Sequence, residues 1–171
     1  MNRFEPGKVI NTNFGVPITI ESFIASGGQG DVYKVTYDGK KKALKWYKPG
    51  ALADPDAFYE NLEKNVKKGS PDKAFLWPQA ITEKTEGSFG YIMDLRPDEY
   101  REFTEILVSS GGGGFSTFKA IVEAGIRIVS AFRSLYKIGY SYQDMNSGNF
   151  FINPKTGAVL ICDNDNVAEY G

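Results

Sequence analysis

The sequence Ile24-Ala-Ser-Gly-Gly-Gln-Gly-Asp-Val32 places three glycines between two runs of β-branched and aromatic residues. These runs, 18–24 and 32–37, have the composition of short strands. A dinucleotide-binding fingerprint instead needs its glycines between a strand and a helix. We therefore predict a glycine-rich hairpin, in which backbone N–H groups can approach phosphate oxygens because no Cβ stands in the way. A loose β-turn without a ligand is the alternative for this segment taken alone.

The first half of the chain is predicted to be mainly β. A third strand-like run, 42–47, follows Asp38-Gly39, a strong two-residue hairpin signal, so the three runs form an antiparallel meander. Apolar residues then recur at helical spacing and predict a helix over 54–68, with Asp54 and Pro55 at its start and Tyr59, Leu62 and Val66 on one face. The segments 75–81 and 88–93 complete a set of five strands and one helix before residue 95.

The second half is predicted to be mainly helical. A short helix is expected over 98–109 and a flexible glycine loop over 109–114. A long helix over 116–139 follows, and we expect its core stripe to be Val122, Ile126, Val129, Phe132 and Tyr136. Two short strands, 149–152 and 159–162, are predicted after it.

Composition excludes several classes of protein. The 171 residues are 42% apolar, which is enough for one ordinary core or two small lobes. Twenty basic residues balance 21 acidic ones to a net charge of -1, so the basic footprint of a nucleic-acid-binding protein is missing. The chain has no histidine, which excludes a Ser-His-Asp triad and an HExxH zinc site. Its single cysteine, Cys162, cannot form an internal disulfide.

The sequence shows no sign of a membrane segment. The N-terminal residues 1–11 lack the apolar core of a secretory signal. The longest apolar stretch, 120–138, is interrupted by four charged residues and falls short of a membrane span. A cytoplasmic protein without membrane partners is the simplest expectation.

Lys45, in Ala43-Leu-Lys45 on the third predicted strand, is the first candidate for charge chemistry. From this strand an ammonium group can reach phosphates beneath the glycine hairpin, held by a carboxylate from the following helix. Glu63 and Glu60 are the candidates for that carboxylate, and the sequence does not separate them. A solvated surface lysine is the alternative reading of Lys45.

The sharpest signal is Tyr142-Gln-Asp-Met-Asn-Ser-Gly-Asn149, with Asp163 fourteen residues after Asn149. Oxygen-bearing side chains at this spacing, in loops at the ends of apolar strands, can hold Mg²⁺ and orient a hydroxyl nucleophile. Asp144, Asn149 and Asp163 are the three candidates. The alternative is that Asp144, Asn146 and Asn149 only cap turns.

Taken in order, these motifs resemble those of the eukaryotic-type protein kinase family, including its bacterial Ser/Thr members. The hairpin resembles the glycine-rich loop, with Ala25, Gly27 and Gly30 at its three glycine positions. Lys42-Ala-Leu-Lys45 resembles the V-A-I-K motif of the third strand. The segment 142–149 resembles H-R-D-L-x-x-x-N, and Asp163 resembles the Asp of D-F-G.

The resemblance implies an α+β, protein-kinase-like fold. It comprises an N-terminal lobe of five antiparallel strands and one helix over 1–96, and a truncated, mainly helical lobe over 97–171. It also implies phosphoryl transfer from ATP·Mg²⁺ to a hydroxyl, of a protein Ser or Thr residue, with Asp144 as catalytic base and Asn149 and Asp163 on the metal. The nucleotide contacts that it implies are Ala25, Gly27, Gly28, Gln29, Gly30, Val32, Ala43, Lys45, the gatekeeper Met93, and the hinge residues Asp94 and Leu95.

Four departures from the family pattern keep other readings open. Tyr142 and Gln143 replace its His and Arg, Asn146 replaces a lysine, and Asn164-Asp165 replaces Phe-Gly. The chain also stops eight residues beyond Asp163, so the activation segment and the later helices are expected to be absent. A pseudokinase that acts through protein contacts is one alternative, and a small-molecule kinase of the aminoglycoside-phosphotransferase type is another. An exposed apolar surface is expected where the later helices would pack, and self-association stays open.

Overall fold

The structure is a computed structural model that describes residues 3–108 and 114–170. The chain forms two compact units: the first comprises residues up to 69 together with 78–95, and the second comprises 70–77 and the residues from 96 onward. The sequence predicted a boundary after residue 96. In the structure the second unit resumes at residue 96, and 70–77 also belongs to it although this segment precedes the last two strands of the first unit.

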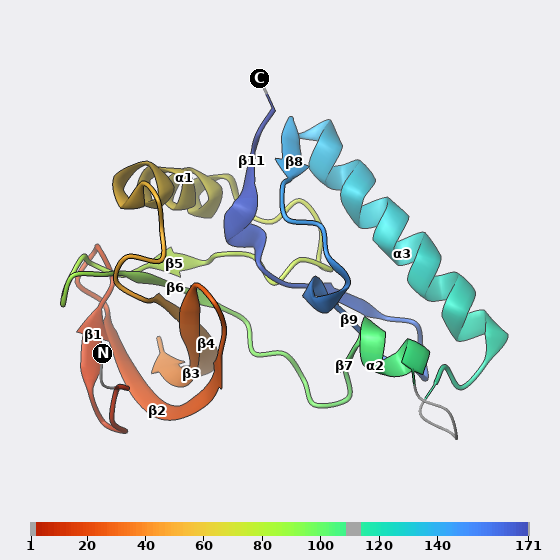
Figure 1. Cartoon of the computed structure of the whole chain (residues 1–171), viewed down its shortest axis with the longest axis horizontal. Helices are drawn as coiled ribbons and strands as arrows, with labels where there is room; N and C mark the ends of the chain where they lie inside the picture. The colour runs from red at the N-terminus through yellow and green to blue at the C-terminus, as the bar shows by residue number, and fades with distance from the viewer. Residues whose placement is uncertain (1–2, 109–113, 171) are drawn as a thin grey trace. The chain divides into compact units, whose positions relative to one another are not determined.

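One antiparallel sheet dominates the first unit (Figure 1), in the order β1-β2-β3-β4-β6-β5. Its strands are β1 (Val9–Asn11), β2 (Pro17–Ser26), β3 (Gly30–Tyr37), β4 (Lys40–Tyr47), β5 (Ala80–Ile81) and β6 (Gly90–Met93). The predicted meander is therefore confirmed, with β1 as an additional edge strand. The predicted strand over 75–81 is wrong for the most part, since only its last two residues pair in this sheet.

The β3–β4 turn shows why the sequence signal was reliable. Asp38 and Gly39 both have positive φ, 49° and 70°, as the two central residues of a type I′ turn require. This turn fixes the register, so that Tyr37 pairs with Lys40 and Val32 pairs with Lys45. The hairpin thereby sets which residues of β4 lie beside the glycine-rich end of β3.

The two faces of this sheet carry different residues. One face buries an apolar cluster that includes Ile18, Val35, Leu44 and Trp46. On the other face Tyr47 contacts Phe58 of helix α1 (Pro55–Lys68), with ring centroids 5.2 Å apart. Residues alternate between faces along a strand, so Lys45 lies on the face that α1 covers.

Helix α1 has the boundaries that its sequence predicts. The Asp54 carboxylate accepts a hydrogen bond from the Ala57 N–H at 3.0 Å, and Pro55 occupies the first turn. The helix ends at Gly69, whose φ of +77° suits a residue without a Cβ. Leu62 is fully buried, as its place on the predicted apolar face requires.

The second unit combines two helices with short strands. The helices are α2 (Phe103–Val108) and α3 (Phe118–Lys137). The strands are β7 (Arg101–Glu102), β8 (Tyr140–Tyr142), β9 (Phe150–Ile152), β10 (Val159–Ile161) and β11 (Val167–Glu169), in the sheets β10-β9-β7 and β11-β8. The helix predicted over 98–109 begins five residues late, and the predicted loop at 109–114 lies almost wholly outside the described residues. The pair β8–β11 was not predicted.

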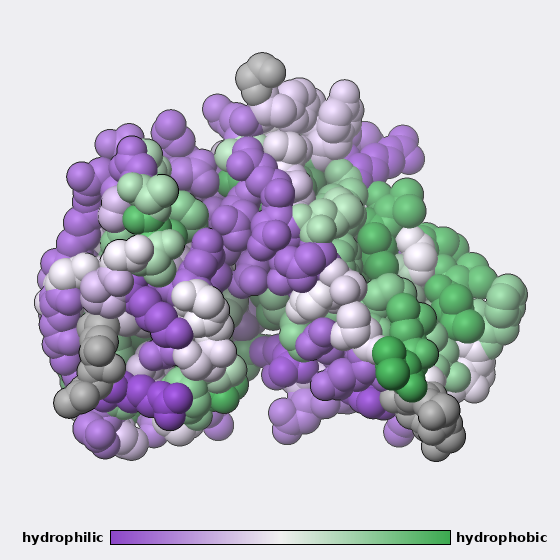
Figure 2. All heavy atoms as spheres, in the orientation of Figure 1, coloured by the Kyte–Doolittle hydropathy of each residue, from purple (hydrophilic) through white to green (hydrophobic). Residues whose placement is uncertain are grey.

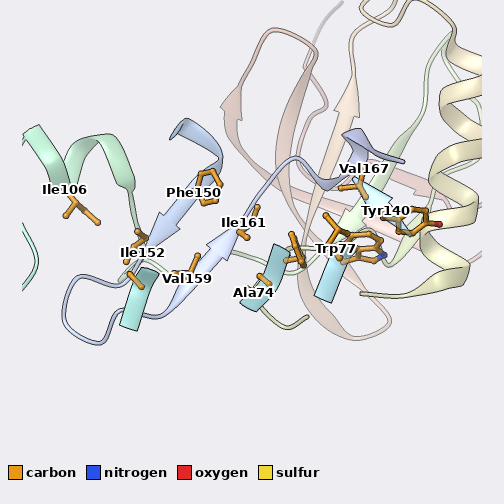
Figure 3. Packing of buried hydrophobic residues seen from close by; sticks show 13 residues of the cluster. Ala74, Trp77, Ile106, Tyr140, Phe150, Ile152, Val159, Ile161 and Val167 are labelled. Atoms are coloured by element: carbon orange, nitrogen blue, oxygen red, sulfur yellow. The ribbon is translucent and has the colours of Figure 1, made fainter. Parts of the chain in front are cut away.

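The core of the second unit explains why 70–77 belongs to it. Phe75 forms a parallel bridge with Ile161, and the Leu76 N–H donates to the Ile161 carbonyl at 2.9 Å. Figure 3 shows Ala74 and Trp77 beside residues of β9, β10 and β11 in one apolar cluster. A short segment therefore passes through this core as a strand-like insert.

Helix α3 forms as predicted, but its predicted core stripe is wrong. Val122, Ile126, Val129 and Tyr136 are 43–69% exposed. The buried residues are instead Ala120, Ala124, Ala131 and Leu135. Small side chains face inward because the β9–β10 turn approaches so closely: a Cβ on Gly157 would lie 2.4 Å from the Ala120 carbonyl oxygen. Of the predicted stripe, only Phe132 packs against the core.

The helices of the two described ranges are too short or too polar to cross a membrane.

Candidate functional site

The glycine-rich segment forms the predicted hairpin between β2 and β3. Ser26 pairs with Asp31, and the Gly27 N–H donates to the Gly30 carbonyl at 2.8 Å, which closes the turn. Gly27, Gly28 and Gln29 are exposed at its tip. Gly28 has open space around the position of a Cβ, so it leaves room for a ligand to approach the backbone.

Lys48, which the sequence analysis missed, holds this hairpin from the end of β4. Its ammonium donates to the Gly27 carbonyl at 2.6 Å and to the Ser26 hydroxyl at 3.0 Å. Its backbone N–H donates to the Gln29 carbonyl at 2.8 Å. The turn is therefore attached to its neighbouring strand at three points. No sequence pattern marked this lysine, since its role depends on the register of β3 and β4.

Lys45 is buried in the middle of the sheet, with 7% of its surface exposed. It pairs with Val32 on β3 and with Tyr91 on β6, and its ammonium lies 5.5 Å from the centre of the Tyr47 ring. The alternative of a solvated surface lysine is therefore excluded. Burying an ammonium costs free energy unless charged or polar groups compensate it, so such lysines commonly serve a function.

The two candidate glutamates differ in exposure. Glu60 is exposed on α1, whereas Glu63 is partly buried and accepts a hydrogen bond from the Asn13 amide at 3.2 Å. Burial raises the pKa of Tyr59, and the negative charge of Glu63 raises it further. Glu63 is therefore the less exposed of the two carboxylates, which favours it over Glu60 as the partner of Lys45. That pairing stays a prediction.

The predicted adenine-contacting residues lie along β4 and β6. Ala43 pairs with Met93, and both are buried. Asp94 follows Met93 and is exposed, with an ion pair to Lys42. Burial acts to raise the pKa of Asp94, but hydrogen bonds from Lys42 and Gln79 outweigh it and hold the pKa below its usual value. The Asp94 carboxylate thus has partners within its own unit.

In the second unit, the loop after β8 carries Asp144 and Asn149. Asn149 is buried, and its amide nitrogen donates to the Asp144 carbonyl at 3.0 Å. The Asn146 side chain caps the following turn by accepting from the Gly148 N–H at 3.0 Å. Asn146 therefore has the capping role that the alternative reading assigned to all three residues, while the Asp144 carboxylate is exposed to solvent.

Asp163 follows β10 in a left-handed conformation, with φ 53° and ψ 43°. Just before it, the Cys162 N–H donates to the Asn149 carbonyl at 2.8 Å, so the two segments lie side by side. The Tyr142 hydroxyl donates to the Cys162 carbonyl at 2.5 Å. Burial raises the pKa of Tyr142 above its usual range, and the charge of Asp163 raises it further, while a hydrogen bond with the Asn149 side chain lowers it. The Tyr142 side chain therefore lies close to both Asn149 and Asp163.

The residues after Asp163 have a structural role that the sequence did not reveal. Asn164 is fully buried, and its amide donates to the Leu76 carbonyl at 2.9 Å and to the Ile161 carbonyl at 2.8 Å. It thereby ties the inserted segment to β10. A phenylalanine, which the family motif has at this position, could not make these bonds.

The donor chemistry of Asn149 and Asp163 fits Mg²⁺. Among the described residues there is no group of three or more Cys, Asp or Glu side chains that could hold a metal ion by itself. A pair of one carboxylate and one amide oxygen suits a hard cation that keeps water and phosphate oxygens as its other ligands. Because the Asn149 nitrogen is directed at Asp144, its oxygen is the atom available to a cation.

Comparison with known proteins gives a clear result at the level of structure. No protein-family model matches the sequence. No curated protein matches it either. Solved structures that resemble it are protein kinases. Vaccinia related kinase 3 superposes with a TM-score of 0.70 at 17% identity over 99% of this chain. A double mutant of the PknI kinase domain of Mycobacterium tuberculosis gives 0.72 at 16% identity over 96%.

These similarities show a protein-kinase-like α+β fold, as the sequence motifs predicted. The chain spans 54% of the length of the vaccinia related kinase 3 chain and 64% of that of the PknI chain. At 16–17% identity the likeness concerns the fold alone.

Proposed function

We propose that this chain is a protein-kinase-like phosphotransferase domain that binds ATP with Mg²⁺ and transfers the γ-phosphoryl group to a protein Ser or Thr hydroxyl. The proposal depends mainly on the burial of Lys45, whose ammonium is carried by a central strand of the sheet. The neighbouring hairpin exposes the backbone of its glycines. A protein that keeps a buried cation beside exposed N–H groups is suited to a polyphosphate ligand.

The first unit would bind the nucleotide. The N–H groups of Gly28 and Gln29, at the exposed tip of the hairpin, would hydrogen-bond the phosphates, and Lys45 would contact the α- and β-phosphates. Glu63 would orient the Lys45 ammonium, which its partly buried position supports. By the resemblance to the kinase family, the adenine ring would lie against Ala25, Val32 and Ala43, with Met93 behind it and the backbone of 94–95 at its edge.

The second unit would supply the metal ligands and the base. Asn149 and Asp163 would hold Mg²⁺, which when bound neutralises charge on the phosphates. Asp144 would accept the proton of the acceptor hydroxyl. The oxygen of that hydroxyl would form a bond to the γ-phosphorus of ATP, while the bond from the γ-phosphorus to the bridging oxygen breaks and ADP leaves. The exposed Asp144 carboxylate and the buried, hydrogen-bonded Asn149 fit these different roles, since only the base must meet a second substrate.

A pseudokinase is the second candidate, and Asn164 favours it. Asn164 stands where the family motif has phenylalanine, and its two buried hydrogen bonds give this position a structural role. A chain built in this way could bind nucleotide, or a protein, without transferring phosphate.

Labelled ATP distinguishes these functions. The chain is incubated with γ-labelled ATP and Mg²⁺, with a mixture of basic and acidic proteins in one reaction and an aminoglycoside in another. The proposal expects label in protein, and Asp144→Asn should reduce the rate by about 100-fold or more. Label in the aminoglycoside would indicate a small-molecule kinase. Nucleotide binding without any transfer would indicate a pseudokinase.

A further inference from the structure

The exposed hairpin between β2 and β3 is held from one side by three polar side chains. The Lys48 ammonium donates to the Gly27 carbonyl at 2.6 Å and to the Ser26 hydroxyl at 3.0 Å. The Ser26 hydroxyl in turn donates to the Asp31 carboxylate at 2.6 Å, and that carboxylate lies 3.8 Å from the Lys48 ammonium. We call Lys48, Ser26 and Asp31 the hairpin clamp.

Hydrogen bonds, rather than burial, fix the ammonium of the hairpin clamp. The Lys48 side chain is 41% exposed, and Figure 2 shows hydrophilic residues over most of the visible surface of the first unit. Holding a long, exposed lysine side chain in one position costs conformational entropy. The bonds to the hairpin tip offset this cost, because a hydrogen bond from a charged donor is stronger than one between neutral groups. Lys48 therefore restrains the turn to which it is bonded.

The hairpin clamp lies on the face of the sheet opposite to Lys45. Asp31 pairs with Trp46, and Val32 pairs with Lys45. Directly paired residues share a face, and neighbours along a strand alternate between faces, so Asp31 lies on the Trp46 face. The clamp therefore does not occupy the side of the hairpin on which Lys45 lies.

The hairpin clamp also sets the direction of one backbone N–H group. The Gly27 carbonyl and the Gly28 N–H belong to the same peptide bond, and no peptide bond among the described residues is cis. In a trans peptide the C=O and N–H groups point in opposite directions. Since the Gly27 carbonyl accepts from Lys48, the Gly28 N–H is directed away from Lys48. No described residue lies within 4 Å of a Cβ position at Gly28, so a ligand can approach this N–H.

The charge of Lys48 strengthens the same N–H group as a donor. Hydrogen bonds in a chain polarise one another. A cation at the oxygen of the Gly27–Gly28 peptide draws electron density toward that oxygen, which leaves the N–H proton more positive. An anion that accepts from the Gly28 N–H would therefore complete a chain that begins at the Lys48 ammonium.

We propose that Lys48 is a positioning residue that orients and polarises the Gly27–Gly28 peptide, so that the Gly28 N–H donates to a phosphate oxygen of the bound nucleotide. This inference rests on the proposed binding of ATP with Mg²⁺. Lys48 would not touch the nucleotide itself, in contrast to Lys45, whose ammonium would contact the phosphates. Because phosphates alone would meet the hairpin tip, the effect of Lys48 should be confined to ligands that carry them.

Nuclear magnetic resonance titration of the isotopically labelled chain measures both the affinity and the state of the Gly28 amide. In the wild type the Gly28 amide proton should move downfield with ATP and Mg²⁺, and it should not move with adenosine. Lys48→Met removes the ammonium and keeps an apolar stem. It should weaken ATP about tenfold, as the loss of a hydrogen bond from a charged group implies, and change adenosine by less than about twofold. At saturating ATP its Gly28 proton should no longer move downfield.

Two control variants accompany this titration, and circular dichroism verifies that all variants fold. Lys48→Arg keeps donors for the Gly27 carbonyl and should bind ATP within about threefold of the wild type. Lys41→Met removes a lysine from the same strand, where Lys41 pairs with Thr36, far from the Gly30–Tyr47 end. The ion pair of Lys41 with Glu21 does not involve the hairpin, so this variant should bind both ligands as the wild type does.

Three results would overturn the role of Lys48. If Lys48→Met weakens adenosine as much as ATP, the residue only supports the fold. If the Gly28 proton of Lys48→Met still moves downfield at saturating ATP, Lys48 does not orient this peptide. If the wild type binds ATP and Lys48→Met binds it equally well, this inference fails while the proposed nucleotide site stands. A wild type that binds neither ATP nor adenosine would instead contradict the proposed function itself, and the role of Lys48 with it.

Discussion

At Gly30 the backbone of β3 runs so close to β4 that a side chain has no room. A Cβ there would lie 2.5 Å from the Trp46 carbonyl oxygen, which is part of the backbone and cannot move aside. We expect Gly30→Ala to lower the free energy of unfolding by about 1–3 kcal/mol. Gly28→Ala, two residues away in open space, should change it by less than about 0.5 kcal/mol. Thermal unfolding of both variants checks this, and equal midpoints would contradict it.

Tyr142 gives a pH-dependent prediction. Its raised pKa means that its contribution to stability is complete below the unfolded-state value of about 10 and is lost as the pH rises toward the folded-state value. Tyr142→Phe loses the hydrogen bond to the Cys162 carbonyl and should cost about 1 kcal/mol at pH 7. Above about pH 10 the wild type loses the Tyr142 contribution, so the two unfolding midpoints should converge. If the difference in unfolding midpoint between the wild type and Tyr142→Phe stays constant from pH 7 to pH 11, folding does not raise the pKa of Tyr142.

The two glutamates of α1 can be separated by substitution. Because Glu63 is partly buried and Glu60 is exposed, Glu63→Gln should weaken ATP binding about tenfold, whereas Glu60→Gln should leave it within twofold. Titration calorimetry with ATP·Mg²⁺ measures both, and each variant serves as the control for the other. The reverse order would assign the role to Glu60.

The first turn of helix α1 is stabilised by the hydrogen bond that caps it. The Asp54 carboxylate caps the start of this helix by accepting a hydrogen bond from the Ala57 N–H. Asp54→Ala should cost about 1 kcal/mol, and Asp54→Asn, which keeps an acceptor, should cost much less. Hydrogen exchange of the first turn of α1 should rise in the alanine variant alone. Equal exchange in both variants would mean that the cap does not hold the turn.

The elements also show where sequence reasoning succeeds. The β3–β4 hairpin and α1 could be predicted because their signals are local: Asp38-Gly39 fixes a turn, and Asp54 and Gly69 mark the ends of a helix. The face that α3 buries could not be predicted, because it depends on the distant Gly157 and the turn that approaches Ala120. Larger apolar residues suggested a core stripe, but the close approach selects alanine instead.

At the scale of the molecule, the candidate residues are distributed over two units. The sequence suggested Lys45, Asp144, Asn149 and Asp163 from their order and spacing, and the structure adds their local environments within each unit. Lys48 and Asn164 could not be predicted, since their hydrogen bonds join segments that only the folded chain brings together. The candidate site residues therefore left clearer sequence patterns than the side chains that support the tertiary structure.

The most direct test of the proposed nucleotide binding is the thermal unfolding midpoint of the chain with ATP and Mg²⁺ together. Ligand at 100 times its Kd adds about 2.7 kcal/mol to the folded state, which for a chain of this length raises the midpoint by several degrees. We predict this rise for the wild type and a smaller rise when EDTA removes Mg²⁺. In Asp163→Asn, EDTA should make no difference to the rise. A folded wild type whose midpoint does not move, or an Asp163→Asn variant that shifts equally, would contradict the proposed binding of ATP with Mg²⁺.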